Sequence, residues 1–171
     1  EFFVDAVSDY KSDFVLFPEY FNAPLMAKFN HLGEAQSIRG LAQYTEEVRD
    51  RFINLAISYN INIITGSMPY VKEDGGLYNV GFLVRRDGSY EMYEKVHVTP
   101  DEIKSWGLSG GKMVQTFDTD CAKIGILICY DVEFPELSRI MADQGMQILF
   151  VPFLTDTQNG YSRVRVCAQA R

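Results

Sequence analysis

Short apolar runs alternate along the chain with longer stretches whose apolar residues recur every three or four positions. The short runs are typical of buried strands, and the longer stretches are typical of helices with one face against a core. Asp87-Gly88 separates two such runs and predicts an antiparallel hairpin. The pattern predicts strands at 13–17, 61–66, 78–84, 90–95, 113–117, 123–128 and 146–152, and helices at 34–59 and 135–145.

Strands that alternate with helices and are interrupted by hairpins predict an α/β protein, with a mixed sheet and helices on its faces. Residues 95–111 contain Pro100, Trp106 and three glycines, so we expect an irregular surface segment there. Helical spacing already begins near Phe3, and residues 164–171 have helical character without a terminating residue. We therefore expect one domain, residues 1–171, that is incomplete at both ends.

Composition narrows the classes of partner. Lys and Arg number 16 against 23 Asp and Glu, giving a net charge of −7, and no basic cluster suits nucleic acid. No apolar run approaches the roughly 20 residues that cross a bilayer, so we expect no membrane association. Cys121, Cys129 and Cys167 are too few for a disulfide framework, and two histidines offer no metal cluster. These features favour a cytoplasmic protein without metal or cofactor.

Three reactive side chains from distant segments each follow a predicted strand. Cys129 precedes a predicted helix, whose N-terminus and backbone N–H groups can lower a thiol pKa and bind an oxyanion. Glu19 stands among aromatic residues, which suits a general base, and Lys95 ends the hairpin, where an ammonium can hold an oxyanion. Singly, each has an ordinary alternative: a core cysteine, a solvated carboxylate and a surface lysine. Their shared position at strand ends favours a catalytic site.

The segments around these residues resemble the signature blocks of the nitrilase, or carbon-nitrogen hydrolase, superfamily. The blocks are Phe17-Pro18-Glu19, Tyr93-Glu94-Lys95-Val96-His97, and Cys129-Tyr130-Asp131 followed by Phe134-Pro135-Glu136. They occur in the family's order, and the resemblance runs over nearly the whole chain. It implies an αββα four-layer sandwich and a catalytic set of Glu19, Lys95 and Cys129.

The resemblance also implies a second, supporting glutamate, which we place at Glu102; the alternative is an exposed loop acid. It implies a small-molecule substrate, a linear amide or carbamoyl compound rather than a nitrile, and a homodimer or higher homo-oligomer. The segments His97-Val98-Thr99-Pro100 and Thr155-Asp156-Thr157-Gln158 resemble the branch in which such a domain is joined to an acetyltransferase-like domain. Candidate substrate-binding residues flank the catalytic positions, with core packing as the alternative for the aromatic ones: Tyr20, Tyr130, Glu133, Phe153 and Thr155.

The expected reaction is hydrolysis of a non-peptide C–N bond through a cysteine thioester. Glu19 would take the proton of Cys129, while Lys95 and the backbone N–H of Tyr130 would stabilise the negative oxygen. Two alternatives stay open. A cysteine hydrolase or acyltransferase could use Cys129 with His97 as base, because Lys95 and His97 point the same way in an extended segment. The chain could also be a catalytically inactive interaction module.

Overall fold

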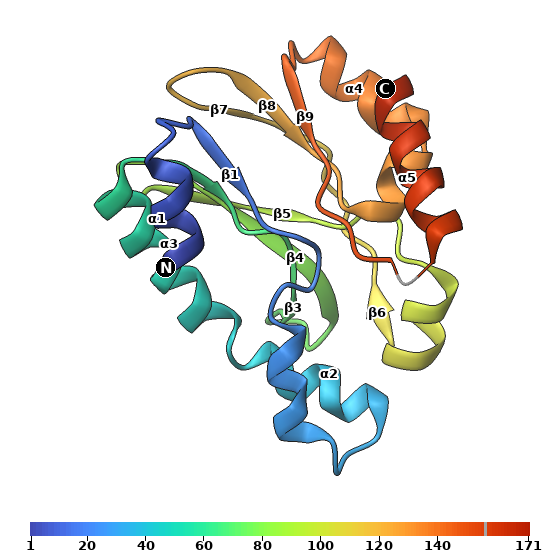
Figure 1. Cartoon of the computed structure of the whole chain (residues 1–171). Coiled ribbons are helices and arrows are strands. Elements are labelled where there is room, and N and C mark those ends of the chain that lie inside the picture. Colours follow the sequence, from blue (N-terminus) through green and yellow to red (C-terminus); the bar gives the residue numbers. More distant parts are fainter. Residues whose placement is uncertain (156) are drawn as a thin grey trace.

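The computed structural model describes residues 1–155 and 157–171, which form four layers in the order helix, sheet, sheet, helix (Figure 1). This layer order confirms the predicted αββα sandwich. Both sheets contain parallel and antiparallel strand pairs, so both are mixed. The first sheet contains β1 (Phe14–Leu16), β2 (Asn62–Ile64), β3 (Met68–Val71), β4 (Leu77–Val84), β5 (Tyr90–Glu94) and β6 (Leu108–Ser109). The second sheet contains β7 (Thr116–Asp118), β8 (Lys123–Ile126) and β9 (Ile148–Phe150).

Strand β4 organises the first sheet. It pairs antiparallel with β2, β3 and β5 and parallel with β6, while β1 lies parallel to the far side of β2. In the second sheet, β8 pairs antiparallel with β7 and parallel with β9. The antiparallel pairing of β4 and β5 confirms the predicted hairpin, with Val84 opposite Tyr90 around the Asp87-Gly88 turn.

Helices cover the outer face of each sheet (Figure 1). Helices α1 (Phe2–Ser8) and α3 (Thr45–Tyr59) lie on the first sheet, and α4 (Pro135–Asp143) and α5 (Gln158–Ala170) lie on the second. Helix α2 (Glu34–Ala42) and the 3-10 helix Ala23–Phe29 pack together at one end of the first sheet. None of the helices in the described residues combines the length and apolar character needed to cross a bilayer.

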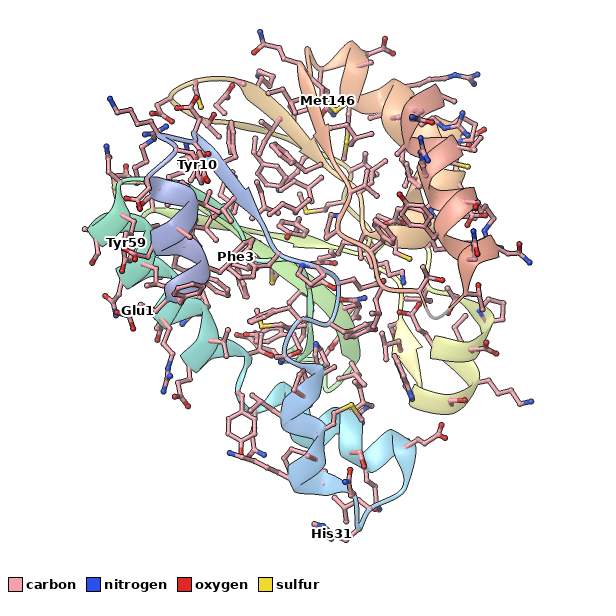
Figure 2. The ribbon with its side chains drawn as sticks, in the orientation of Figure 1. Glu1, Phe3, Tyr10, His31, Tyr59 and Met146 are labelled. Carbon is pink, nitrogen blue, oxygen red and sulfur yellow. The ribbon has the colours of Figure 1, made fainter. Side chains whose placement is uncertain are left out.

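The apolar runs of β2 and β4 are continuous because these two strands are buried on both faces. Ile63 packs toward α3, whereas its neighbour Ile64 packs between the two sheets against residues such as Phe117 and Ile124. Side chains fill the space between the sheets, while Tyr10 and His31 lie at the surface (Figure 2). Strands β1 and β5, which Glu19 and Lys95 follow, pair with these two buried strands, and the pairing fixes the positions of their ends.

Several predicted elements differ from the observed ones. The predicted helix 34–59 is two helices, broken at residues 43–44, and α3 then ends at Asn60 in the left-handed conformation (φ 50°). Strand β3 was not expected. Residues 95–111 are not simply a surface segment, because the π-helix Glu102–Trp106 buries Glu102 and β6 pairs with β4. A buried cation, described below, accounts for the burial of Glu102.

Candidate active site

Glu19 lies just past β1 and is almost fully buried, with 3% of its surface exposed. The turn that carries it packs closely on Gly66 (φ +70°), where an added Cβ would lie 1.9 Å from the carbonyl oxygen of Pro18. Only glycine permits this approach. Both carboxylate oxygens of Glu19 are engaged: Oε1 accepts from Asn79 Nδ2 at 3.1 Å, and Oε2 accepts from the backbone N–H of Leu154 at 3.0 Å.

Lys95 follows β5, and its ammonium lies between two buried carboxylates. Nζ donates to Glu19 Oε1 at 2.8 Å and lies 2.9 Å from both oxygens of Glu102. Glu102 also accepts from Tyr20 Oη at 2.8 Å and from the backbone N–H of Thr99 at 2.7 Å. Glu102 therefore belongs to the same site as Lys95, and the alternative of an exposed loop acid is wrong.

The electrostatics of this cluster favour the charged forms of Lys95 and Glu102. Burial alone would lower the pKa of Lys95, but the negative charges of Glu19 and Glu102 outweigh it and raise that pKa. Burial would raise the pKa of Glu102, but Lys95 and three hydrogen bonds outweigh it and lower that pKa. A permanent ammonium is therefore held in place before any substrate arrives, which is the arrangement that oxyanion stabilisation requires.

Cys129 follows β8 at the start of the 3-10 helix Cys129–Glu133, and it has the left-handed conformation (φ 48°). For a residue with a Cβ this conformation costs on the order of 1–3 kcal/mol, and such residues cluster at functional sites. The N–H of Cys129 donates to the carbonyl of Pro152 at 2.9 Å, and its Sγ lies 3.8 Å from the carbonyl oxygen of Leu154. Leu154 thus contacts both the Cys129 sulfur and, through its N–H, Glu19.

The expected lowering of the thiol pKa is wrong. Burial, and next the negative charge of Glu19, raise the pKa of Cys129 to about 12, while Lys95 opposes the rise only in part. The helix that follows has only five residues, so it offers little dipole to oppose desolvation. The resting thiol therefore keeps its proton, and a base must remove it during the reaction.

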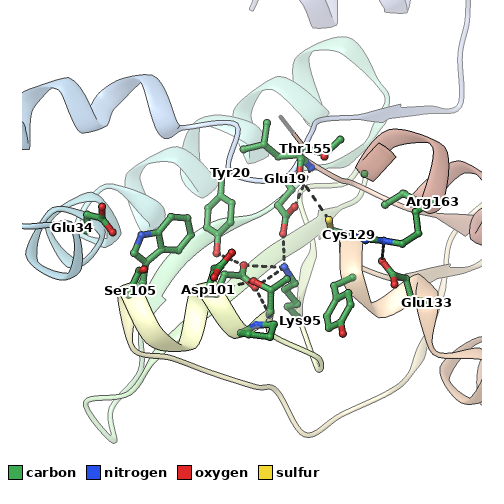
Figure 3. Close-up of a pocket in the computed structure, with 18 residues that line it drawn as sticks. Glu19, Tyr20, Glu34, Lys95, Asp101, Ser105, Cys129, Glu133, Thr155 and Arg163 are labelled. Atoms are coloured by element: carbon green, nitrogen blue, oxygen red, sulfur yellow. Dashed lines mark hydrogen bonds and ion pairs between the residues drawn. The ribbon is translucent and has the colours of Figure 1, made fainter. Parts of the chain in front are cut away.

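A single pocket of about 740 Å³ brings the candidates together (Figure 3). Glu19, Lys95, Glu102 and Cys129 all line it. A cavity of this size accommodates a small-molecule substrate. Among the described residues, no group of three or more His, Cys, Asp or Glu side chains converges as metal ligands would.

Four of the five candidate substrate-binding residues also line the pocket: Tyr20, Tyr130, Glu133 and Thr155. Phe153 does not. Its ring packs on the core outside the second sheet and lies 6.0 Å from the ring of Tyr161. The prediction for Phe153 is therefore wrong, and the core alternative holds, because its side chain points to the helix layer while the next residues turn toward the pocket.

Sequence reasoning missed several contributors to the site. Trp106 lines the pocket and meets Tyr20 edge to face at 5.4 Å, and Arg163 of α5 forms an ion pair with Glu133 at 2.6 Å (Figure 3). Asn79 is fully buried beside Glu19. A signal for Asn79 existed, because an amide within a buried strand requires a polar partner. No comparable sequence signal marks Arg163.

His97 lies outside the pocket lining. Its ring stacks on Phe134 at 3.7 Å, and its Nδ1 lies 3.3 Å from Asp131. Asp131 and Phe134 thus contact the imidazole, whereas Glu19 lines the pocket together with Cys129. The geometry thus favours Glu19 over His97 as the base.

Comparison with known proteins matches the whole chain, residues 1–171, to the family described as carbon-nitrogen hydrolase. The chain is 50% identical over 171 residues to "Probable hydrolase YhcX" of Bacillus subtilis, covering 100% of this chain and 33% of that protein. It is 34% identical over 151 residues to the Homo sapiens "Omega-amidase NIT2", covering 81% of this chain and 50% of that one.

The solved structures of similar fold include Saccharomyces cerevisiae Nit3, a member of branch 10 of the nitrilase superfamily. It matches with a TM-score of 0.77 at 25% identity, covering 99% of this chain and 62% of that one. A carbon-nitrogen hydrolase from Helicobacter pylori also gives a TM-score of 0.77. The chain spans 33% of YhcX and 50% of NIT2, so it matches at most half the length of either curated relative.

Proposed function

The chain belongs to the carbon-nitrogen hydrolase family, and from this premise we propose that it carries the active site of an amidase that works through a thioester on Cys129. The observation that carries the proposal is the buried Glu19–Lys95–Glu102 cluster, which lines one pocket with Cys129. Base, cation and thiol are the three groups that acyl transfer from an amide needs.

The first half of the reaction forms the acyl-enzyme. The sulfur of Cys129 attacks the amide carbon while its proton passes to Glu19, and the negative oxygen is held by Lys95 and the backbone N–H of Tyr130. An ammonium has three N–H donors. Nζ lies 2.9 Å from both Glu102 oxygens, and we propose that one N–H is shared between them, which leaves a third N–H for the oxyanion. The C–N bond then breaks, and the amine leaves with the proton from Glu19.

The second half returns the enzyme. Glu19 takes a proton from water, the hydroxide attacks the thioester carbon, and Lys95 again holds the oxygen. The C–S bond breaks, the acid leaves, and the thiolate of Cys129 recovers the proton from Glu19. The sum is amide plus water to acid plus amine. The raised pKa of the Cys129 thiol suits this cycle. The thiol does not lose its proton without a base, and the thiolate readily takes a proton back when the acid leaves.

Substrate class, assembly and further domains are also proposals. The amidase names of relatives such as NIT2 support a linear amide or carbamoyl substrate over a nitrile. We propose one hydrolase domain over residues 1–171, in a cytoplasmic homodimer. We also propose a fused acetyltransferase-like domain in the full-length protein. The match covers 33% of YhcX, so a relative of this chain has room for a further domain.

The test is ammonia or amine release from a panel of linear amides, carbamoyl compounds and nitriles, using the full-length protein. We expect turnover of at least one amide, loss of turnover in Cys129→Ala, and unchanged turnover in the matched variant Cys121→Ala, because Cys121 lies outside the pocket. The variant His97→Ala should keep its activity. Loss of activity in that variant would favour the alternative in which His97 is the base for Cys129. An inactive module would turn over none of these compounds and would carry no acyl group on Cys129 after incubation with an amide.

A further inference from the structure

Asp131 is a buried carboxylate that the reaction above does not use. Only 1% of its side chain is exposed, and it lies outside the lining of the pocket. Removing a charge from water is costly unless hydrogen bonds compensate for it, so a buried carboxylate that does not contact the substrate requires another explanation. Its neighbours provide one.

Asp131 accepts hydrogen bonds from both segments that carry the proposed catalytic groups. On one side it accepts from the backbone N–H groups of Val96 at 3.2 Å and His97 at 2.7 Å, the two residues that follow Lys95. On the other side it accepts from the N–H of Ile128 at 3.3 Å, the residue that precedes Cys129. One carboxylate thus joins the backbone next to the ammonium to the backbone next to the thiol.

This bridge matters because the two groups come from different sheets. Lys95 follows β5 of the first sheet and Cys129 follows β8 of the second, and no backbone ladder joins the two sheets in the part of the chain that the structure describes. Side-chain contacts must therefore fix their alignment. The hydrogen bond to Ile128 also closes the turn in which Cys129 is held at positive φ.

We propose that Asp131 is a positioning residue that aligns the ammonium of Lys95 with the sulfur of Cys129, without contacting the substrate. This inference rests on the roles of Lys95 and Cys129 in the proposed function. A purely structural role would weaken folding alone. A positioning role would instead impair the step that needs both groups at once, because a misplacement of about 1 Å can cost on the order of a hundredfold in rate.

Two reagents separate these possibilities, and neither depends on the natural substrate. p-Nitrophenyl acetate acylates the thiol through an oxyanion: the thiol proton passes to Glu19, an S–C bond forms, the ester C–O bond breaks and p-nitrophenolate leaves. Methyl methanethiosulfonate reacts at sulfur: an S–S bond forms between Cys129 and the methylthio group, the S–S bond of the reagent breaks, methanesulfinate leaves, and the thiol proton passes to solvent. This reaction has no oxyanion for Lys95 to hold. The ratio of the two rate constants at Cys129 therefore reports the alignment of Lys95. Both are measured on the full-length protein at pH 7.5, where Asp131 is ionised because its raised pKa is about 6.

We expect Asp131→Asn to lower this ratio by tenfold or more, since the amide presents an N–H₂ to donors that need an acceptor. The matched variant Glu136→Gln, an exposed acid on α4 outside the pocket, should leave the ratio unchanged. A ratio that changes by less than tenfold in Asp131→Asn overturns the proposal. If that variant does not fold, Asp131→Glu, which keeps the charge but lengthens the side chain, is judged by the same threshold. If Asp131→Asn lowers the ratio as expected but the full-length protein turns over no compound of the panel, the proposed substrate class is overturned and the positioning role of Asp131 stands.

Discussion

The two walls of the pocket differ in how firmly their charges are held. The inner wall consists of Glu19, Lys95 and Glu102, whose side chains are between 1% and 7% exposed and are hydrogen-bonded to one another. The outer wall consists of Glu133, Thr155 and Arg163, where the Arg163 side chain is 61% exposed. Charges in the low-dielectric interior act strongly and at fixed positions, whereas exposed pairs are screened by water. Reactivity should therefore reside in the inner wall and substrate preference in the outer one.

The largest effect should come from Lys95→Ala. We expect a rate loss on the order of a hundredfold or more, as for removal of an oxyanion-hole donor. The free energy of unfolding should fall by about 3–5 kcal/mol, because two buried carboxylates lose their cation. The measurements are kcat/KM and urea unfolding, with the exposed Lys104→Ala as the matched control. A loss of less than tenfold in rate would contradict the assignment.

Glu102→Gln should have the next largest effect. A hydrogen bond to a charged group contributes about 1.5–3 kcal/mol, so we expect a decrease in kcat of roughly tenfold to a hundredfold. Because Glu102 raises the pKa of Lys95, its loss should also move the high-pH limb of the rate profile to lower pH. The control is Glu73→Gln, an exposed acid between β3 and β4. A pH profile identical to that of the wild type would argue that Glu102 has no influence on Lys95.

The reaction of Cys129 with methyl methanethiosulfonate should depend steeply on pH. An ordinary thiol levels off near its pKa of about 8.5. The pKa of Cys129 is raised to about 12, so its thiolate fraction, and hence its rate, should keep rising about tenfold per pH unit from pH 7 to 10. Glu19→Gln removes a charge that raises this pKa, so that variant should react faster at a given pH while turning over substrate more slowly. Levelling near pH 8.5 would show that burial does not govern this thiol.

The smallest effect should come from the outer wall. The side chain of Arg163 is 61% exposed, so its ion pair with Glu133 should contribute only about 0–1 kcal/mol. Glu133→Gln should therefore change KM by up to about fivefold and leave kcat nearly constant. Steady-state kinetics with the best amide from the panel would measure this. If kcat fell as much as in the Glu102 variant, the division between the two walls would be wrong.

Much of the fold could be predicted from the sequence because strands that contribute to the core produce short apolar runs. The runs at 13–17 and 61–66 contain β1 and β2, and the alternation near Asp87-Gly88 gave the hairpin. The break at residues 43–44 could not be predicted, since the apolar spacing continues across it. Tertiary packing decides such breaks: the hydroxyl of Thr45 donates to the carbonyl of Pro69 at 2.6 Å at the start of α3.

The candidate site was predictable only as far as residue identity signals chemistry. Glu19, Lys95 and Cys129 lie together because each follows a strand, but the burial of Glu102 depends on Lys95, seven residues earlier in the chain. The direction of the Cys129 pKa shift was wrong because it depends on burial and on Glu19, a residue from a distant segment. The packing of the helix layer decides which way the Phe153 side chain faces. It also brings Arg163 of α5 next to Glu133.

Catalysis through a thioester on Cys129 is tested most directly by the mass of the peptide that contains Cys129. The peptide is taken from the full-length protein, quenched in acid during turnover of an amide. We predict a mass increase equal to the acyl group on Cys129 and on neither Cys121 nor Cys167, and none in Cys129→Ala. Catalysis by Cys129 would be contradicted if Cys129→Ala formed the acid product at the wild-type rate and no wild-type cysteine carried an acyl group.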